Sequence, residues 1–261
     1  MSDPEVNEVY AVRFAHHAAR TRAENFLGGD PHDAPMPFDY FVFVVRGPSG
    51  TVVVDTGFDA KVAAKRGRQH LRCPTEGLRC LGIAPDAVDD VVLTHLHYDH
   101  CGNQHLFPRA RFHLQAAEMA YATGPCMCHA VLRGGYDPDD IAATVRKLFE
   151  GGLTYHDGDG ALRPGITVHR VGGHTDGQQV VRVWTRQGWL VLASDATHFF
   201  ENFERNLPFP WVYHVGATLD GFRRLRSLAS AETLVIPGHD PEIMARFPTV
   251  KGAEGIAVRL D

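Results

Sequence analysis

The stretch "VVLTHLHYDHCGN", residues 91–103, places three histidines and an aspartate within six residues, directly after an apolar run. His95 and His97 are two residues apart. On a helix their side chains would point about 200° apart and could not bind one ion, whereas on an extended segment they share a face with Asp99. Asp99 and His100 are adjacent and point in different directions. The stretch therefore predicts a buried strand that runs into a loop and divides its ligands between two metal ions.

Three other predicted strands also end in residues that can bind metal. "ITVHRVGGHTDG" ends with His174, "WLVLASDATH" with Asp195 and "TLVIPGHDP" with His239. In layered α/β proteins the strand ends at one edge of a sheet are where ligands bind. We therefore expect seven residues to meet at one rim, rather than to be unrelated polar caps. They are His95, His97, Asp99, His100, His174, Asp195 and His239.

Composition sets limits on the class of protein. The 261 residues are 44% hydrophobic and 22% charged, which is ordinary for a globular protein. The formal net charge of −5 argues against nucleic acid or an anionic membrane as a partner. We find no signal peptide and no apolar run of membrane-spanning length. Five cysteines, an odd number, indicate reduced thiols and a cytoplasmic location. The 16 histidines are the one unusual feature of the composition, and a surplus of this size suggests a metal-binding site.

Hydrophobic periodicity and turn residues predict strands and helices in mixed order. The predicted strands, with a Gly-Pro-Ser-Gly turn dividing residues 38–57 into two, are 8–14, 38–57, 88–95, 165–173, 178–185, 188–195 and 232–240. The predicted helices are 59–70, 75–83, 137–152 and 216–230, and residues 110–124 form a short strand that leads into a helix.

Four motifs, "THLHYDH", "GGHTDG", "ASDATH" and "IPGHDP", resemble the metallo-β-lactamase superfamily. "VVVDTG" is similar to the early Asp-Thr-Gly turn of that family, in which Asp55 would support the site. The resemblance runs from about Val42 to His239. It implies an α/β fold, an αβ/βα four-layer sandwich of two mixed β-sheets with helices outside. We expect a single such domain over residues 1–261, with residues 1–40 partly a lid or N-terminal extension.

The resemblance also implies how the ligands are shared. One metal ion would take His95, His97 and His174, a second would take Asp99, His100 and His239, and Asp195 would bridge them. Two Zn²⁺ ions suit nitrogen and oxygen ligands of this kind, with iron or manganese as alternatives. Two cations that share a bridging water lower its pKa enough to supply hydroxide near neutral pH.

Within the superfamily, several branches fit poorly. Only 22 residues follow His239, so we expect no helical substrate domain of the glyoxalase II type. Secreted β-lactamases need a signal peptide, and flavin-linked di-iron relatives carry an acid where this chain has His97. The chain most resembles the N-acyl-homoserine lactonases, which open a lactone ring by attack of a metal-bridging hydroxide. There Asp99 would be both ligand and proton shuttle. Many of those enzymes place a Tyr where this chain has His198, a residue that can also donate a hydrogen bond or proton.

Other functions remain open. The same site could serve a thioesterase or another carboxylic ester hydrolase, a mononuclear iron persulfide dioxygenase, or a non-catalytic metal-binding scaffold. The expected partner is a small-molecule lactone or ester, with homodimerisation as an open alternative. Residues 13–40 are rich in Gly and Pro and could fold over the site as a lid. Four aromatic residues could line an apolar pocket: Phe199, Phe200, Phe209 and Trp211.

Overall fold

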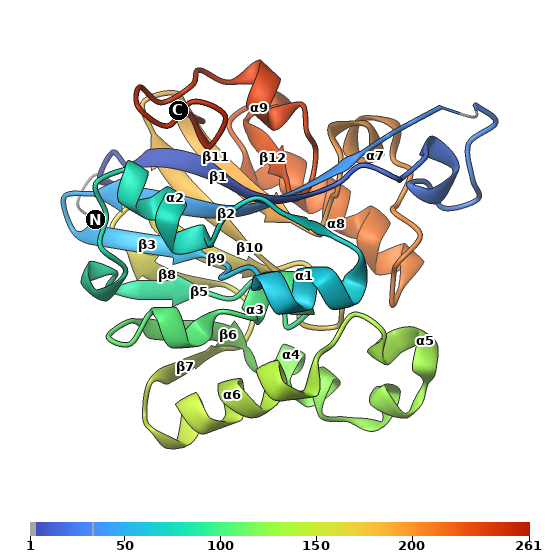
Figure 1. Ribbon diagram of the computed structural model, residues 1–261, viewed down its shortest axis with the longest axis horizontal. Helices are drawn as coiled ribbons and strands as arrows, with labels where there is room; N and C mark the ends of the chain where they lie inside the picture. Colours follow the sequence, from blue (N-terminus) through green and yellow to red (C-terminus); the bar gives the residue numbers. More distant parts are fainter. Residues whose placement is uncertain (1–3, 33) are drawn as a thin grey trace.

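The computed structural model describes residues 4–32 and 34–261. Within these ranges the chain forms two mixed β-sheets packed face to face (Figure 1). The larger sheet has the order β13-β1-β2-β3-β5-β6-β7, with β4 beside β1. Its strands are β1 (Glu8–His17), β2 (Phe38–Gly47), β3 (Gly50–Val54), β4 (Gln69–His70), β5 (Asp90–Val92), β6 (Arg111–Gln115), β7 (Leu153–His156) and β13 (Ala257–Arg259).

The smaller sheet has the order β12-β11-β10-β9-β8. Its strands are β8 (Gly160–Arg163), β9 (Ile166–Arg170), β10 (Gln179–Thr185), β11 (Gly188–Ser194) and β12 (Val235–Pro237). Parallel pairing occurs along β3, β5, β6 and β7 and between β11 and β12. The remaining pairs are antiparallel, so both sheets are mixed, as the family resemblance implies.

The alternation of side chains along each strand separates the core into layers. On β2, Phe41 and Phe43 belong to the apolar cluster between the two sheets, where they meet residues such as Val181 of β10. Tyr40 and Val42 point the other way, into the cluster beneath the helices that cover the larger sheet. β2 is thus apolar on both faces, which is what burial between two layers requires.

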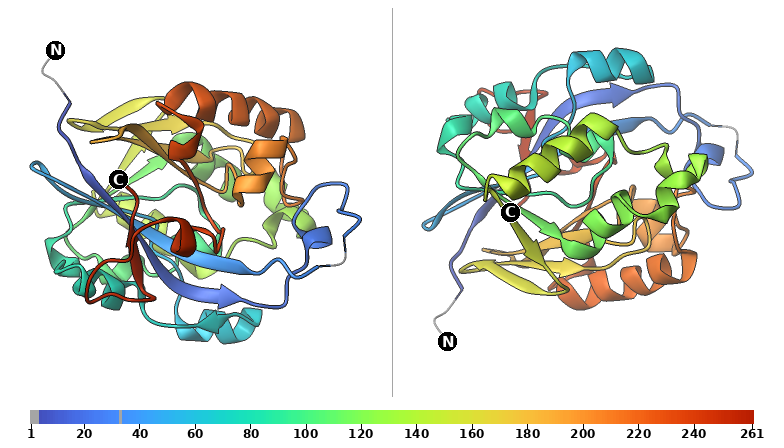
Figure 2. Two further views of the ribbon diagram at one scale, coloured as in Figure 1. Left: turned by 90° about the horizontal axis from the view of Figure 1, so that it is seen from above. Right: turned by 90° about the horizontal axis from the view of Figure 1, so that it is seen from below.

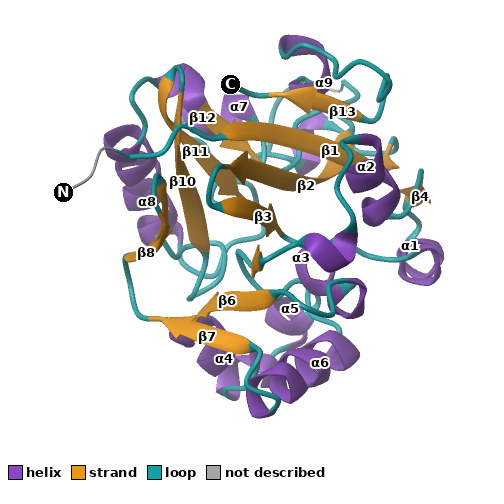
Figure 3. Cartoon of the chain, turned by 90° about the vertical axis from the view of Figure 1, so that its left-hand side faces the viewer, coloured by secondary structure: helices purple, strands orange, loops and turns teal. Residues whose placement is uncertain are grey.

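Helices cover the outer face of each sheet (Figures 2 and 3), which completes the predicted αβ/βα sandwich. The larger sheet is covered by α1 (Ala60–Arg66), α2 (Pro74–Cys80), α4 (Ala116–Ala122) and α6 (Pro138–Phe149). The smaller sheet is covered by α7 (Phe200–Arg205) and α8 (Val215–Leu228). The short helices are α3 (Tyr98–Cys101), α5 (Ala130–Arg133) and α9 (Ile243–Arg246).

Two helix ends show how local sequence sets the boundaries. α6 begins after Asp137, whose side chain accepts from the N–H of Asp139, and it has Pro138 in its first turn. α1 is shorter than the predicted helix 59–70 because Gly67 adopts a left-handed conformation, φ 65°, at its end. The chain after Gly67 instead forms β4, which pairs with β1.

The prediction for residues 13–40 was wrong in part. Residues 13–17 continue β1 and residues 38–40 begin β2, so both ends of this segment belong to the larger sheet. Phe26, in the intervening stretch, is also buried, at 1% exposure. The Gly and Pro residues of this segment lie in the turns between the apolar positions. Their number made the whole segment look irregular in the sequence. In the described part of the chain, no helix is both long and apolar enough to span a membrane.

Candidate metal centre

The seven predicted ligand residues meet around the carboxylate of Asp195. Its Oδ2 lies 3.3 Å from Nε2 of His174 and 3.9 Å from Nε2 of His95. Its Oδ1 lies 2.9 Å from Nε2 of His239 and 3.2 Å from Nε2 of His100. Each oxygen therefore faces a different set of imidazoles, which is the arrangement that a carboxylate shared between two cations requires.

The ligand atoms separate into groups whose members all lie within 4.8 Å of one another. One group contains His95, His97, His174 and Asp195, and another contains Asp99, His100 and His239. All seven side chains are buried. The structure thus brings together every residue that the motifs selected and divides them as expected, although which of them bind metal stays a prediction.

Unpaired nitrogens show that the cluster fits a cation. Nε2 of His95 and Nε2 of His100 are buried, point towards Asp195 and have no hydrogen-bond partner among the described residues. Buried polar atoms in proteins are nearly always paired. Burial also lowers the pKa of His95, His97 and His174, the last to about 3, so these imidazoles stay neutral, the form that binds metals. A metal ion would satisfy the nitrogens that the protein leaves unpaired.

Negative charge is concentrated around His100. Burial favours its neutral form, but Asp195, Asp55 and Asp99 outweigh burial and raise the pKa of His100 well above its usual value. The distance from Nδ1 of His100 to Oδ2 of Asp55 is only 2.7 Å. Three buried carboxylates around one imidazole attract a cation, which supports the same conclusion.

The opposite ring nitrogens of the histidines are anchored by the surrounding protein. Nδ1 of His174 lies 2.7 Å from the carbonyl oxygen of Trp211, and Nδ1 of His239 lies 2.9 Å from the carbonyl oxygen of Asp39. Together with the His100–Asp55 pair, these contacts fix the ring orientations and turn each Nε2 inward. Such contacts are the usual support of metal-bound imidazoles.

Strained backbone occurs at two positions beside the cluster. Asp55, directly after β3, has φ 65°, and Ser194, directly before Asp195, has φ 46°. Asp55 accepts hydrogen bonds from the N–H and the hydroxyl of Thr94, and the Thr94 and Ser194 hydroxyls lie 2.9 Å apart. Left-handed conformations of residues other than glycine cost energy and concentrate at functional sites. Here they tie the ends of β3, β5 and β11 together.

Glu118 at the start of α4 is a buried carboxylate that holds two ligand loops. Its Oε1 accepts from the N–H of Leu96 at 3.0 Å and from the hydroxyl of Tyr136 at 3.0 Å. Its Oε2 accepts from the hydroxyl of Thr175 at 2.6 Å and from the N–H of Gly177 at 3.1 Å. Glu118 therefore connects the loop of His95 and His97 to the loop of His174.

A small pocket with a free volume of about 40 Å³ opens onto the cluster. Phe209 and Trp211 line it, as expected, and Gly135 and Tyr98 lie beside the ligands. The expectation for Phe199 and Phe200 was wrong, because they line a different cavity. Phe199 is fully buried and packs its ring against Phe38 at a centroid distance of 5.6 Å.

His198, the residue in the place of the family's Tyr, is part of the pocket wall. Its ring stacks on Phe209 with centroids 3.8 Å apart, and its Nε2 lies 3.0 Å from Oδ2 of Asp195. Burial lowers the pKa of His198 to about 4, so the side chain is neutral at pH 7. It is also close enough to Asp195 and His239 to join them as a ligand.

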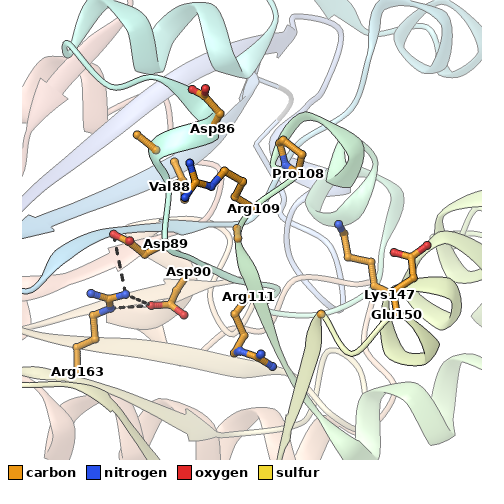
Figure 4. A pocket seen from close by; sticks show the side chains of 13 residues that line it. Asp86, Val88, Asp89, Asp90, Pro108, Arg109, Arg111, Lys147, Glu150 and Arg163 are labelled. Carbon is orange, nitrogen blue, oxygen red and sulfur yellow. Dashed lines mark hydrogen bonds and ion pairs between the residues drawn. The ribbon is translucent and has the colours of Figure 1, made fainter.

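A much larger cavity, of about 810 Å³, lies elsewhere on the protein and contains none of the seven residues (Figure 4). Arg163 in its wall pairs with Asp90, Nε to Oδ2 2.6 Å, and lies 3.9 Å from Asp89. Basic and acidic side chains alternate around it, so it presents no single charge to a ligand. It is therefore separate from the pocket that opens onto the metal cluster.

Several supporting residues belong to no recognisable motif in the sequence. Glu118, Thr94, Ser194 and Asp39 are ordinary polar residues until the chain folds, and their partners lie far away along it. Asp55 was identified through its Asp-Thr-Gly turn. The only available clue was position, because Thr94 and Ser194 directly precede the ligands His95 and Asp195.

Comparison with known proteins identifies the family of this chain. Residues 36–239 match the family model of the metallo-beta-lactamase superfamily. The chain belongs to the metallo-β-lactamase superfamily. An N-acyl homoserine lactonase, AttM, of Agrobacterium fabrum is 30% identical over 240 residues, which covers 84% of this chain and 87% of the relative.

Solved structures with the same metallo-β-lactamase fold are also similar. A quorum-quenching N-acyl homoserine lactone lactonase has a TM-score of 0.78 at 21% identity, covering 96% of this chain and 99% of that one. A dizinc quorum-quenching lactonase, AidC, determined with a homoserine product, has a TM-score of 0.70 at 16% identity, covering 92% and 91%. At these identities the two structures support the fold.

Proposed function

We propose that this protein is a lactonase that uses two divalent metal ions to hydrolyse the ester bond of an N-acyl-homoserine lactone or a related lactone. The observation that carries the proposal is the position of Asp195, whose two oxygens face separate sets of imidazoles at the base of a pocket. The similarity to AttM, a named N-acyl homoserine lactonase, supports the choice of reaction.

In this proposal His95, His97 and His174 hold one ion, Asp99, His100 and His239 hold the other, and Asp195 contacts both. Zinc is the first choice because the set is rich in imidazole, and the similar AidC structure is described as dizinc. Iron and manganese are the alternatives. Bound ions of this kind supply a water of lowered pKa and polarise a carbonyl group.

Asp99 is assigned the proton transfer. Its Oδ2 lies 3.7 Å from Nε2 of His100 and 3.9 Å from Nε2 of His239, and the residue lines the pocket with 9% exposure. There it can accept a proton from the attacking water and deliver it to the ring oxygen as the C–O bond breaks. A carboxylate at the boundary between cluster and pocket is suited to this role.

His198 is assigned a hydrogen bond to the substrate. Its stacking on Phe209 holds the ring in the pocket wall, and a neutral imidazole retains one N–H donor. The short distance to Asp195 offers a competing role, as an additional ligand or a support of the bridging carboxylate. Metal content and activity of variants separate these roles.

We also propose that residues 1–261 form one domain in which part of the segment before residue 40 covers the site, and that the protein works in the cytoplasm. The location is supported by five free thiols, since cysteines are kept reduced in that compartment.

The test combines metal analysis with substrate turnover. Purified protein is assayed for bound metal, and lactone opening is followed in a pH-stat on homoserine lactones, simple lactones and acyl thioesters. Two ions per chain with lactone opening is the expected result. Hydrolysis of thioesters alone would make the protein a thioesterase, one iron per chain with oxygen uptake on a persulfide would make it a dioxygenase, and a fully metallated but inert protein would make it a scaffold.

A further inference from the structure

Two arginines, Arg20 and Arg68, line the same pocket as Asp99 and His198. Arg20 follows β1, and Arg68 lies between α1 and β4. Both side chains are partly buried. Among the described residues, neither guanidinium has a carboxylate within 4.0 Å, whereas Arg163 pairs with Asp90.

Arg20 is held in position by neutral groups. Its Nε donates to Oδ1 of Asn25 at 2.7 Å, and its Nη2 donates to the carbonyl oxygen of Glu24 at 2.7 Å. Its guanidinium also lies over two aromatic rings of the pocket, 5.0 Å from the centroid of Phe209 and 5.5 Å from that of Phe38. Nη1 of Arg20 has no partner in residues 4–32 or 34–261.

Arg68 has similar surroundings. Its Nε donates to the hydroxyl of Tyr98 at 3.4 Å, and its Nη1 lies 3.2 Å from Nε2 of His17. Burial, followed by the charges of Arg68 and Arg20, lowers the pKa of His17 to about 4, so this imidazole adds no charge of its own at pH 7. Nη2 of Arg68 makes no hydrogen bond within the described ranges.

The pocket therefore contains two partly buried cations, each with one terminal nitrogen that makes no hydrogen bond and no carboxylate within 4.0 Å among the described residues. Taking a charge out of water is costly unless a partner of opposite charge is nearby. Guanidinium groups are also the side chains best suited to bind carboxylates, because their N–H groups form a fixed fork. A ligand anion is the partner that would compensate both residues.

We propose that Arg20 and Arg68 bind a carboxylate carried by the substrate, so that the preferred substrate is a compact lactone with an anionic group near its ring. This inference rests on the proposed lactonase function and narrows its substrate class. The aromatic wall of Phe38, Phe209 and Trp211 suits the apolar face of a small ring. Arg20 and Arg68 are then specificity-determining residues, while Asp99 and the metal cluster do the chemistry.

The test uses two lactones of matched size, 5-oxotetrahydrofuran-2-carboxylate and its carboxamide, with the metal-loaded protein. The ratio of their kcat/KM values reports recognition of the charge. We expect the wild-type protein to favour the carboxylate roughly ten- to hundredfold, the effect of a charge-assisted hydrogen bond, and Arg20→Met or Arg68→Met to reduce that ratio about tenfold. Arg68→Lys should restore part of it, and the exposed control Arg79→Met should leave it unchanged.

Calorimetric binding of the two ring-opened products provides a readout that does not depend on turnover. The dicarboxylate product should bind the wild-type protein more tightly than its monoamide, and the arginine variants should lose that difference. Opening of both lactones without a charge preference, or a preference that survives in both arginine variants, would overturn the anion site and leave the lactonase intact. Charge-selective binding with no opening of any lactone would overturn the lactonase proposal and support the anion site.

Discussion

Replacing Glu118 by Gln tests whether a buried carboxylate outside the metal cluster organises it. Each oxygen of Glu118 accepts one backbone N–H and one hydroxyl. In Glu118→Gln one oxygen becomes an amide that donates. The hydroxyl opposite it can rotate and accept, but the backbone N–H of Leu96 or Gly177 cannot, so one buried donor loses its acceptor.

The expected loss of stability follows from the one buried N–H that loses its acceptor. An unsatisfied buried N–H costs about 1–3 kcal/mol. Burial raises the pKa of Glu118, which shows that its charge is costly to desolvate. Removing that charge therefore offsets part of the loss in stability. We therefore expect the free energy of unfolding to fall by about 1–2 kcal/mol. Because Leu96 lies between His95 and His97, metal affinity should also fall about 10- to 100-fold.

Urea denaturation measures the stability, and competition with a chelator measures the metal affinity. The control is Glu76→Gln on α2, which makes the same chemical change at an exposed position. A Glu118→Gln protein that keeps both the stability and the metal affinity of the wild type would refute the role assigned to Glu118.

Three further predictions concern the site and its surroundings. Asp55→Asn should keep the fold, because Asn tolerates the left-handed backbone, but should weaken metal binding about 10- to 100-fold in chelator competition, because His100 loses its carboxylate partner. Burial raises the pKa of Asp140 from 3.8 to about 7, so the folded state retains a proton that the unfolded state releases, and stability falls as pH rises from about 4 to 7. The free energy of unfolding of Asp140→Asn should therefore exceed that of the wild type at pH 8 by on the order of 1–3 kcal/mol in urea denaturation, with no such gain at pH 4 and none for the exposed control Asp86→Asn. His198→Gln, which keeps a donor, should retain at least about tenfold more lactone-opening activity than His198→Phe at equal metal content, and loss of one metal ion from both would identify His198 as a ligand instead.

The sequence predicted the ligand strands because their signals are local. β5, β9, β11 and β12 are short apolar runs, and each is followed within a few residues by its ligand. The alternation in residues 91–103 placed His95 and His97 on an extended segment, but its prediction for Asp99 was wrong. Asp99 and His100 lie in the short helix α3, which turns Asp99 towards His100 and His239, as the family resemblance implied. The positions of α6 and α8 also followed from caps and periodicity, since both are long enough to show them.

Short elements were missed. β7, β8 and β13 contain three or four residues each and form sheet edges, so each is too short to show a periodic pattern. Phe199 and Phe200 were placed in the pocket because they follow a ligand strand, but the chain turns there into α7 and directs them elsewhere.

The supporting hydrogen bonds were missed for a different reason. Glu118 contacts Gly177, and His239 contacts Asp39, across 59 and 200 positions of the chain. Nothing in the composition of either segment records that contact. The arginines of the pocket are a similar case, because only the fold brings residues 20 and 68 beside Asp99.

The most direct test of the metal centre is a titration of metal-stripped protein with Zn²⁺ while lactone opening is followed. If seven residues hold two ions that act together, the rate should rise to a plateau at two equivalents per chain, and His97→Ala should not reach it. A plateau at one equivalent, or opening of the lactone without metal, would contradict the dinuclear mechanism.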